Sequence, residues 1–114
     1  VYPVASAYNR VPGFEFGDLV DAPVMMVTGE LDEYDDDPEA GPKLVASLDP
    51  ADAAKVKVHV MKGAHHCFDM PGANVVVTDP VSHRGAGGEV HMLFNDEAMR
   101  KAHGLAVDFF SAAL

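Results

Sequence analysis

The sequence predicts an α/β fold, in which helices flank a mostly parallel sheet. Two apolar segments have the length of strands, a segment with helical spacing separates them, and an amphipathic segment ends the chain. Strands that alternate with helices form mostly parallel sheets, because each crossover returns the chain to the same edge. The length of 114 residues fits one domain or a piece of a larger one.

The first part of the chain is expected to run strand, loop, strand, loop. Residues 1–5 are β-prone and predict the tail of a strand, and residues 8–23 contain proline and two glycines, which predict a long loop. Residues 23–28, PVMMVT, form a continuous apolar run, typical of a strand buried on both faces. The acidic residues that follow, 29–42, predict a loop.

The middle of the chain predicts two helices and a second strand. Apolar residues recur at helical spacing over 40–48. Asp49 followed by Pro50 is typical of the N-cap and first turn of a helix, here a short one over 50–54. The alternation of VKVHVM, 56–61, predicts a strand that is less fully covered than the previous one.

The last part is expected to be a loop followed by a long helix. Residues 71–90 predict mostly loop, in which 74–78 adds a short strand and the glycine-rich 85–88 forms a flexible linker. Asn95 is the expected N-cap of the final helix, with acidic residues in its first turn. The predicted buried stripe of that helix consists of Ala98, Ala102, Leu105, Phe109 and Ala113.

Charge and composition exclude several classes of partner. The net charge is −10, so the phosphates of nucleic acids and anionic membrane surfaces would be repelled. No apolar run approaches the roughly 20 residues that a membrane helix needs. The single cysteine, Cys67, forbids an internal disulfide and fits a reducing compartment, which favours the cytoplasm.

Candidate catalytic residues follow the two central strands. Ligands bind open parallel sheets at the carboxyl ends of the strands. Asp32 follows the first strand, and His65 and His66 follow the second, so the crossover brings them to one edge. An aspartate there would accept one ring N–H of a histidine and leave the other nitrogen to take a proton from a nucleophile. Asp35, Asp36 and Asp37 are expected to form a solvated loop, although one of them could replace Asp32 as the acid.

Two other readings of this region are weaker. Cys67 adjoins a histidine, but neighbouring residues usually point apart, and a buried packing role is the more frequent one for cysteine. His65 and His66 could join acids in a metal site, but the helical or knuckle spacing of zinc ligands is absent, and the acidic segment departs from the calcium-loop pattern. We therefore expect no metal and no cofactor.

The segments PVMMVTGELD and GAHHCFD together resemble the C-terminal half of the α/β-hydrolases, specifically the dienelactone hydrolase family. In that family, a strand ends in a glycine that the acid of the catalytic triad soon follows, and the next strand ends in a His-x-Phe turn that carries the base. The resemblance implies that Asp32 is the acid and His66 the base, with Cys67 and Phe68 completing the turn pattern. The first eight residues and the last helix also resemble that family.

The family places its nucleophile upstream of the acid, on a G-x-[SC]-x-G elbow. This motif is absent, because the serines lack the flanking glycines; they are Ser6, Ser47, Ser82 and Ser111. The resemblance therefore implies that residues 1–114 are one partial α/β-hydrolase domain without the N-terminal half. They would supply the acid and base of a Ser/Cys-His-Asp triad that hydrolyses a small ester or lactone.

A second class of function remains open. Half a sheet leaves an open strand edge and an uncovered apolar face, which favour association with the missing N-terminal half or with a copy of the chain. In this hypothesis the protein is a non-catalytic fragment or interaction module that has lost the reaction. A metal-binding domain is the third hypothesis.

Overall fold

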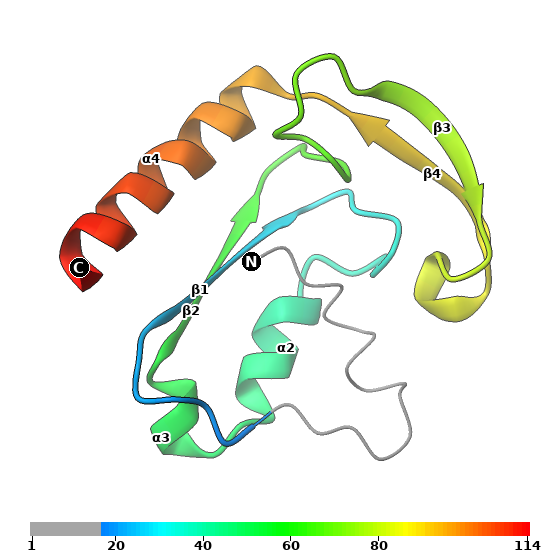
Figure 1. The fold of residues 1–114 in the computed structure, drawn as a ribbon. Helices are drawn as coiled ribbons and strands as arrows, with labels where there is room; N and C mark the ends of the chain where they lie inside the picture. The colour runs from blue at the N-terminus through cyan, green and yellow to red at the C-terminus, as the bar shows by residue number, and fades with distance from the viewer. Residues whose placement is uncertain (1–16) are drawn as a thin grey trace.

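The computed structural model describes residues 17–114 as a small α/β unit (Figure 1). The strand predicted at 1–5 and the loop residues up to 16 lie outside the described residues. Two strands form a parallel pair, β1 (Val24–Gly29) and β2 (Val56–Met61), and two more form an antiparallel hairpin, β3 (Asn74–Asp79) and β4 (Gly88–Leu93). The predicted α/β class is therefore confirmed, but the parallel sheet comprises two of the four described strands.

The crossover from β1 to β2 runs through two short helices, α2 (Ala40–Ala46) and α3 (Pro50–Ala53). Both helices were predicted, with ends one or two residues further along the chain. Asp49 is the N-cap of α3, because its carboxylate accepts hydrogen bonds from the backbone N–H groups of Ala51 and Asp52 at 2.9 and 3.1 Å. The crossover lets β1 and β2 run in parallel, so both strands end at the same edge.

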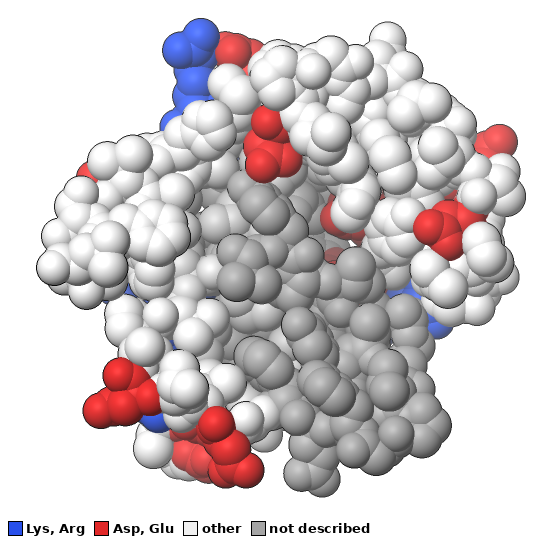
Figure 2. Space-filling model, viewed as in Figure 1, with Lys and Arg blue, Asp and Glu red and all other residues white. Residues whose placement is uncertain are grey.

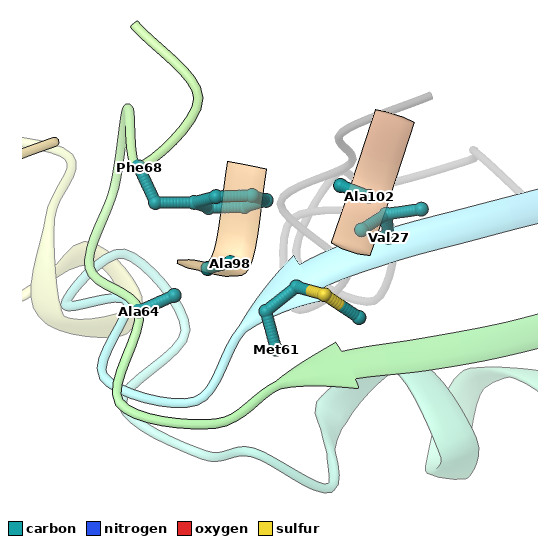
Figure 3. Packing of buried hydrophobic residues seen from close by; sticks show 6 residues of the cluster. All are labelled: Val27, Met61, Ala64, Phe68, Ala98 and Ala102. Carbon is teal, nitrogen blue, oxygen red and sulfur yellow. The ribbon is translucent and has the colours of Figure 1, made fainter. Parts of the chain in front are cut away.

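Side chains of β1 alternate between the two faces of the parallel pair, as the period of a strand requires. Met26 packs against α2 through Leu44 on one face. Val27 packs on the opposite face, in a cluster with Ala98 and Ala102 of α4 (Asp96–Ala113). Figure 3 shows this second cluster, in which Phe68 points toward the helix segment that carries Ala98. Helices therefore cover both faces of the pair, which explains the continuous apolar sequence of β1.

Helix α4 begins as predicted, because the Asn95 side chain accepts a hydrogen bond from the backbone N–H of Ala98 at 3.0 Å. Its first half is buried at Ala98 and Ala102. The predicted buried stripe is wrong at the other end, where Ala113 is exposed and Phe109 only partly buried. An open groove separates that end of the helix from the parallel pair, so the pair does not bury it.

The hairpin corrects the expectation that residues 71–90 are mostly loop. The short strand predicted at 74–78 is confirmed as β3, but β4 was not predicted. The connection between the two strands contains a short 3-10 helix, η1 (His83–Gly85), and the glycine-rich segment 85–88 runs from its end to the first residue of β4 and is not a flexible linker. Gly87 and Gly88 have φ angles of +80° and +147°, which side chains disfavour, so glycines allow this turn to close.

Acidic side chains are spread over the face of the molecule in Figure 2, whereas lysine and arginine lie mostly at its margins. Within residues 17–114, no helix is both long enough and apolar enough to pass through a membrane.

Candidate active site

Two loops leave the shared edge of the parallel pair, the Asp32 loop (residues 30–39) after β1 and the His66 loop (residues 62–73) after β2. Backbone hydrogen bonds join them, from the N–H of Glu30 to the carbonyl of Met61 at 3.0 Å and from that of Leu31 to the carbonyl of Ala64 at 2.8 Å. Gly29 permits this approach, because a Cβ there would lie 2.5 Å from the Ala64 carbonyl oxygen. The glycine before the acid thus has a steric role.

The Asp32 carboxylate and the His66 ring are in direct contact, 34 positions apart in the sequence. His66 Nδ1 lies 2.8 Å from Asp32 Oδ2, so the predicted contact is confirmed. The other carboxylate oxygen, Oδ1, accepts a hydrogen bond from the backbone N–H of Tyr34 at 2.9 Å. With both oxygens engaged, the carboxylate is fixed, and Nδ1 is the nitrogen that donates. In the neutral ring Nε2 then carries the lone pair.

The surroundings of His66 favour its protonated form. The hydrogen bond to Asp32 raises the pKa of His66 above its ordinary value, against burial, which lowers it, and the charges of Asp32 and Asp69 act in the same upward direction. A base whose conjugate acid is stabilised in this way can accept a proton from a neighbouring group and hold it during a reaction.

A pocket of about 320 Å³ lies beside the pair. Both loops and the end of β1 line it, and its lining includes the carboxylates of Asp32, Asp35 and Asp69 but no lysine or arginine from the described residues. The full lining is Val27, Thr28, Gly29, Asp32, Asp35, His65, His66, Cys67, Phe68, Asp69 and Met70. A small molecule in this pocket would contact the pair directly.

His65 lines the same pocket but has different contacts. Its Nδ1 is buried without a hydrogen-bond partner, and its ring lies 5.7 Å, between centroids, from the ring of His91. No group of three or more histidine, cysteine, aspartate or glutamate side chains in residues 17–114 is arranged to hold a metal ion. His66 is therefore the histidine that an acid orients, and His65 is its neighbour.

Cys67 differs from the buried packing residue that was expected, because it is only partly buried. Its backbone has φ +59°, a left-handed conformation uncommon for a residue with a side chain. Burial raises the pKa of the Cys67 thiol, and the negative charges of Asp69 and Asp32 raise it further. The thiol stays protonated at neutral pH, which disfavours a nucleophilic role.

The three aspartates after Tyr34 differ in their exposure to solvent. Asp35 is buried, with 7% of its surface exposed. Asp36 Oδ2 lies 2.7 Å from His83 Nδ1, and Asp37 accepts hydrogen bonds from the Lys43 ammonium and the Glu39 backbone N–H. The prediction of a solvated loop is therefore wrong for Asp35, because the Asp32 loop lies against the hairpin and not in open solvent.

Tyr34 is the residue that sequence reasoning missed. It is 9% exposed, and its ring lies against that of His66, with centroids 4.6 Å apart and planes at 54°. Its hydroxyl donates a 2.6 Å hydrogen bond to Asp79 Oδ2 on β3. The only signal in the sequence was an aromatic residue two positions after the candidate acid, within an otherwise acidic segment.

Comparison with known proteins provides no relative. No protein-family model, curated protein or solved structure matches the chain. The functional interpretation therefore depends on the geometry of the Asp32–His66 pair and on the residues around it.

Proposed function

We propose that these residues supply the acid and base of a Ser/Cys-His-Asp triad in an ester or lactone hydrolase similar to the dienelactone hydrolase family of α/β-hydrolases. The observation that supports this most is the 2.8 Å contact between His66 Nδ1 and Asp32 Oδ2. The other oxygen of this carboxylate accepts a hydrogen bond from the backbone N–H of Tyr34. The pair lies where two parallel strands end, which is where open α/β sheets bind ligands, and it borders a pocket.

In the proposed reaction, His66 acts first as a base. Its Nε2 takes the proton of a serine or cysteine nucleophile as that residue attacks the ester carbonyl, and the resulting tetrahedral intermediate collapses with release of the alcohol. His66 gives the proton to the leaving alcohol oxygen. It then deprotonates the water that attacks the acyl-enzyme, and it returns this proton to the serine oxygen or cysteine sulfur as the bond to the acyl carbon breaks and the acid is released. Asp32 keeps Nδ1 protonated and stabilises the imidazolium throughout.

The nucleophile in this proposal comes from outside the 114 residues. Cys67 is disfavoured because its thiol pKa is raised. Ser82 is fully buried, and its hydroxyl is within hydrogen-bond distance of the carbonyls of Asp79 and Gly88 in the hairpin turn.

The test is ester and lactone hydrolysis by the full-length gene product, with p-nitrophenyl acetate and dihydrocoumarin as probes. His66→Ala and Asp32→Asn should each lower kcat by about 10³- to 10⁴-fold, because the base is lost or held in the wrong tautomer. The matched controls, His103→Ala and Asp108→Asn, lie exposed on α4 and should retain wild-type turnover. Undiminished turnover in either pair variant would remove that residue from the mechanism.

A non-catalytic interaction module is the second candidate. It is favoured by an apolar groove of about 560 Å³ between the end of α4 and the parallel pair, lined in part by Met25, Leu105 and Phe109. Among residues 17–114, β1 and β2 pair only with each other, so each has an edge without a strand partner. A second copy of the chain would bring the same edge and the same apolar surface, as a twofold dimer requires.

Light scattering tests this candidate. A dimer that Phe109→Ser converts to a monomer would support it, whereas Val81→Ser, a matched change at an exposed hairpin valine, should leave the dimer intact. If the wild-type protein remains monomeric at about 100 μM, the dimer candidate is rejected. Its dissociation constant would then exceed about 100 μM, which corresponds to less than roughly 6 kcal/mol of association free energy.

A further inference from the structure

Tyr34 contacts both members of the Asp32–His66 pair. Its backbone N–H donates to Asp32 Oδ1 at 2.9 Å, and its ring lies beside the His66 ring, with centroids 4.6 Å apart and planes tilted by 54°. Rotation of the imidazole about its Cβ–Cγ bond would break the contact with Asp32, and a tyrosine ring at this separation leaves the imidazole little room to turn. The tyrosine thus limits the ring to orientations in which Nδ1 faces Asp32.

The far end of Tyr34 is fixed by the hairpin. Its hydroxyl donates to Asp79 Oδ2 at 2.6 Å, and Asp79 Oδ1 accepts a hydrogen bond from the backbone N–H of Val81 at 2.9 Å. The hydrogen bond to Asp79 raises the pKa of Tyr34 to about 12, so the phenol stays protonated at neutral pH and serves as a donor, not as a base. An aromatic ring anchored at both ends cannot swing away from its neighbour.

The hairpin also holds the backbone of His66. The N–H of Leu93, at the end of β4, donates to the His66 carbonyl at 3.1 Å, and Met92 forms an isolated bridge with His66. His66 is therefore fixed in three ways: its backbone by β4, its Nδ1 by Asp32 and its ring by Tyr34. The first contact comes directly from the hairpin, and the third depends on it through the hydrogen bond from Tyr34 to Asp79, although the hairpin contributes no group to the pair.

We propose that Tyr34 is a positioning residue, through which Asp79 of the hairpin fixes the imidazole of His66 in the orientation that an acid-base role needs. The effect on turnover rests on the proposed hydrolase function, but the effect on the ring does not. Tyr34 acts on the reaction only through His66. A tyrosine that merely fills space would affect the stability of the fold but not the tautomer of a neighbouring histidine.

The experiment measures the His66 ring by NMR in the full-length protein. Ring ¹⁵N shifts report the tautomer, and a pH titration of the Cε1 proton reports the pKa. Tyr34→Phe keeps the aromatic ring and removes the link to Asp79, whereas Tyr34→Leu also removes the ring but keeps the backbone donor to Asp32. Wild-type His66 should show a single neutral tautomer with its proton on Nδ1.

Both variants should mix the tautomers and move the pKa of His66 down toward its ordinary value, Tyr34→Leu more than Tyr34→Phe. Asp36→Asn is the matched control, because it breaks another side-chain link to the hairpin, at His83, without touching the pair. It should leave the His66 signals unchanged. His103, exposed on α4, serves as the internal reference in each spectrum.

A single Nδ1–H tautomer and an unaltered titration in Tyr34→Phe would overturn the proposal. Tyr34→Phe should fold even if Tyr34→Leu does not, because it removes one hydroxyl and leaves the partly exposed Asp79 carboxylate in contact with water. Tyr34→Phe therefore decides the outcome in that case.

In the active enzyme, kcat should fall about 10-fold for Tyr34→Phe and up to about 100-fold for Tyr34→Leu, with KM nearly constant. Such losses are expected when a catalytic group is displaced by a small distance. If His66→Ala retains turnover, the proposed catalytic role of the pair fails, and the NMR result still decides the positioning role.

Discussion

The β1–β2 pair has helices on both faces, whereas the β3–β4 hairpin is attached to the rest of the described chain largely through polar contacts. Buried apolar side chains lie on both faces of the pair, such as Met26 on one face and Val27 with Phe68 on the other. In the hairpin, by contrast, Val75 and Val76 are about half exposed, whereas Val90 is completely buried.

Carboxylates of the Asp32 loop hold the hairpin in place. Glu33 accepts hydrogen bonds from the backbone N–H and from the ring of His91, and Asp36 contacts His83. Burial alone would raise the pKa of Glu33, but the hydrogen bonds from His91 lower it. The site thus joins two regions with different sources of stability. Burial of apolar surface fixes the strand ends that precede Asp32 and His66, and hydrogen bonds between carboxylates and histidines fix the hairpin behind them.

The largest expected effect is on the apolar half. Phe68→Ala removes a 2% exposed ring from the cluster between the pair and α4, and it should lower the free energy of unfolding by about 3–5 kcal/mol. Val76→Ala, at a half-exposed position of the hairpin, should change it by less than about 0.5 kcal/mol. Urea unfolding followed by circular dichroism measures both. Equal losses would mean that the hairpin shares the same core and that the comparison is wrong.

A smaller effect is expected where the two loops meet. Gly29→Ala places a Cβ 2.5 Å from the Ala64 carbonyl oxygen, so the backbone must move, at a cost of about 1–3 kcal/mol. The displacement should also weaken the Asp32–His66 contact and lower the pKa of His66. Gly104→Ala is the matched control, because it has open space around it within α4 and should stabilise the helix by up to about 1 kcal/mol. Full stability in Gly29→Ala would show that the loops are not held at this distance.

The smallest effect is local and depends on pH. Both ring nitrogens of His83 face acceptors, the Asp36 carboxylate and the Glu89 carbonyl, each at 2.7 Å, so the doubly protonated ring satisfies both. The hydrogen bond to the Glu89 carbonyl raises the pKa of His83, as does the contact with Asp36. A raised folded-state pKa means that this contribution is complete below about pH 6.5 and is lost as the pH rises through the folded value.

Hydrogen exchange between pH 6 and 8, corrected for intrinsic rates, tests this dependence. Amides of β3 and β4 should lose protection as the pH rises, while those of β1 and β2 should lose much less. Asp36→Asn should reduce the dependence in the hairpin, because the carboxylate that favours the imidazolium is gone. An equal loss of protection in both regions would contradict the assignment of this pH dependence to the hairpin.

Local sequence signals predicted the elements of the parallel half. The apolar run of β1, the alternation of β2 and the cap residues Asp49 and Asn95 each specify their element without distant contacts. Strand β4 was missed because its alternation, with Val90 buried between polar neighbours, follows directly on a glycine-rich turn that reads as a linker.

The candidate site was predictable only in its two principal members. Asp32 and His66 could be paired because parallel strands end at one edge, a rule of topology. Tyr34 could not be assigned, since its partner Asp79 lies on a hairpin whose position depends on tertiary contacts. The burial of Asp35 was missed for the same reason.

The spacing of these contacts along the chain has a kinetic consequence. The hydrogen bonds that join Asp32 to His66 and the Asp32 loop to the hairpin span 34, 45, 47 and 58 positions of the sequence. Each must close a long loop before it contributes any free energy, so such contacts form slowly. Helix α4 and the crossover helices can form from local contacts alone. We therefore expect refolding to recover helical structure before the tertiary environment of His66, with the Asp32–His66 pair among the last contacts to form.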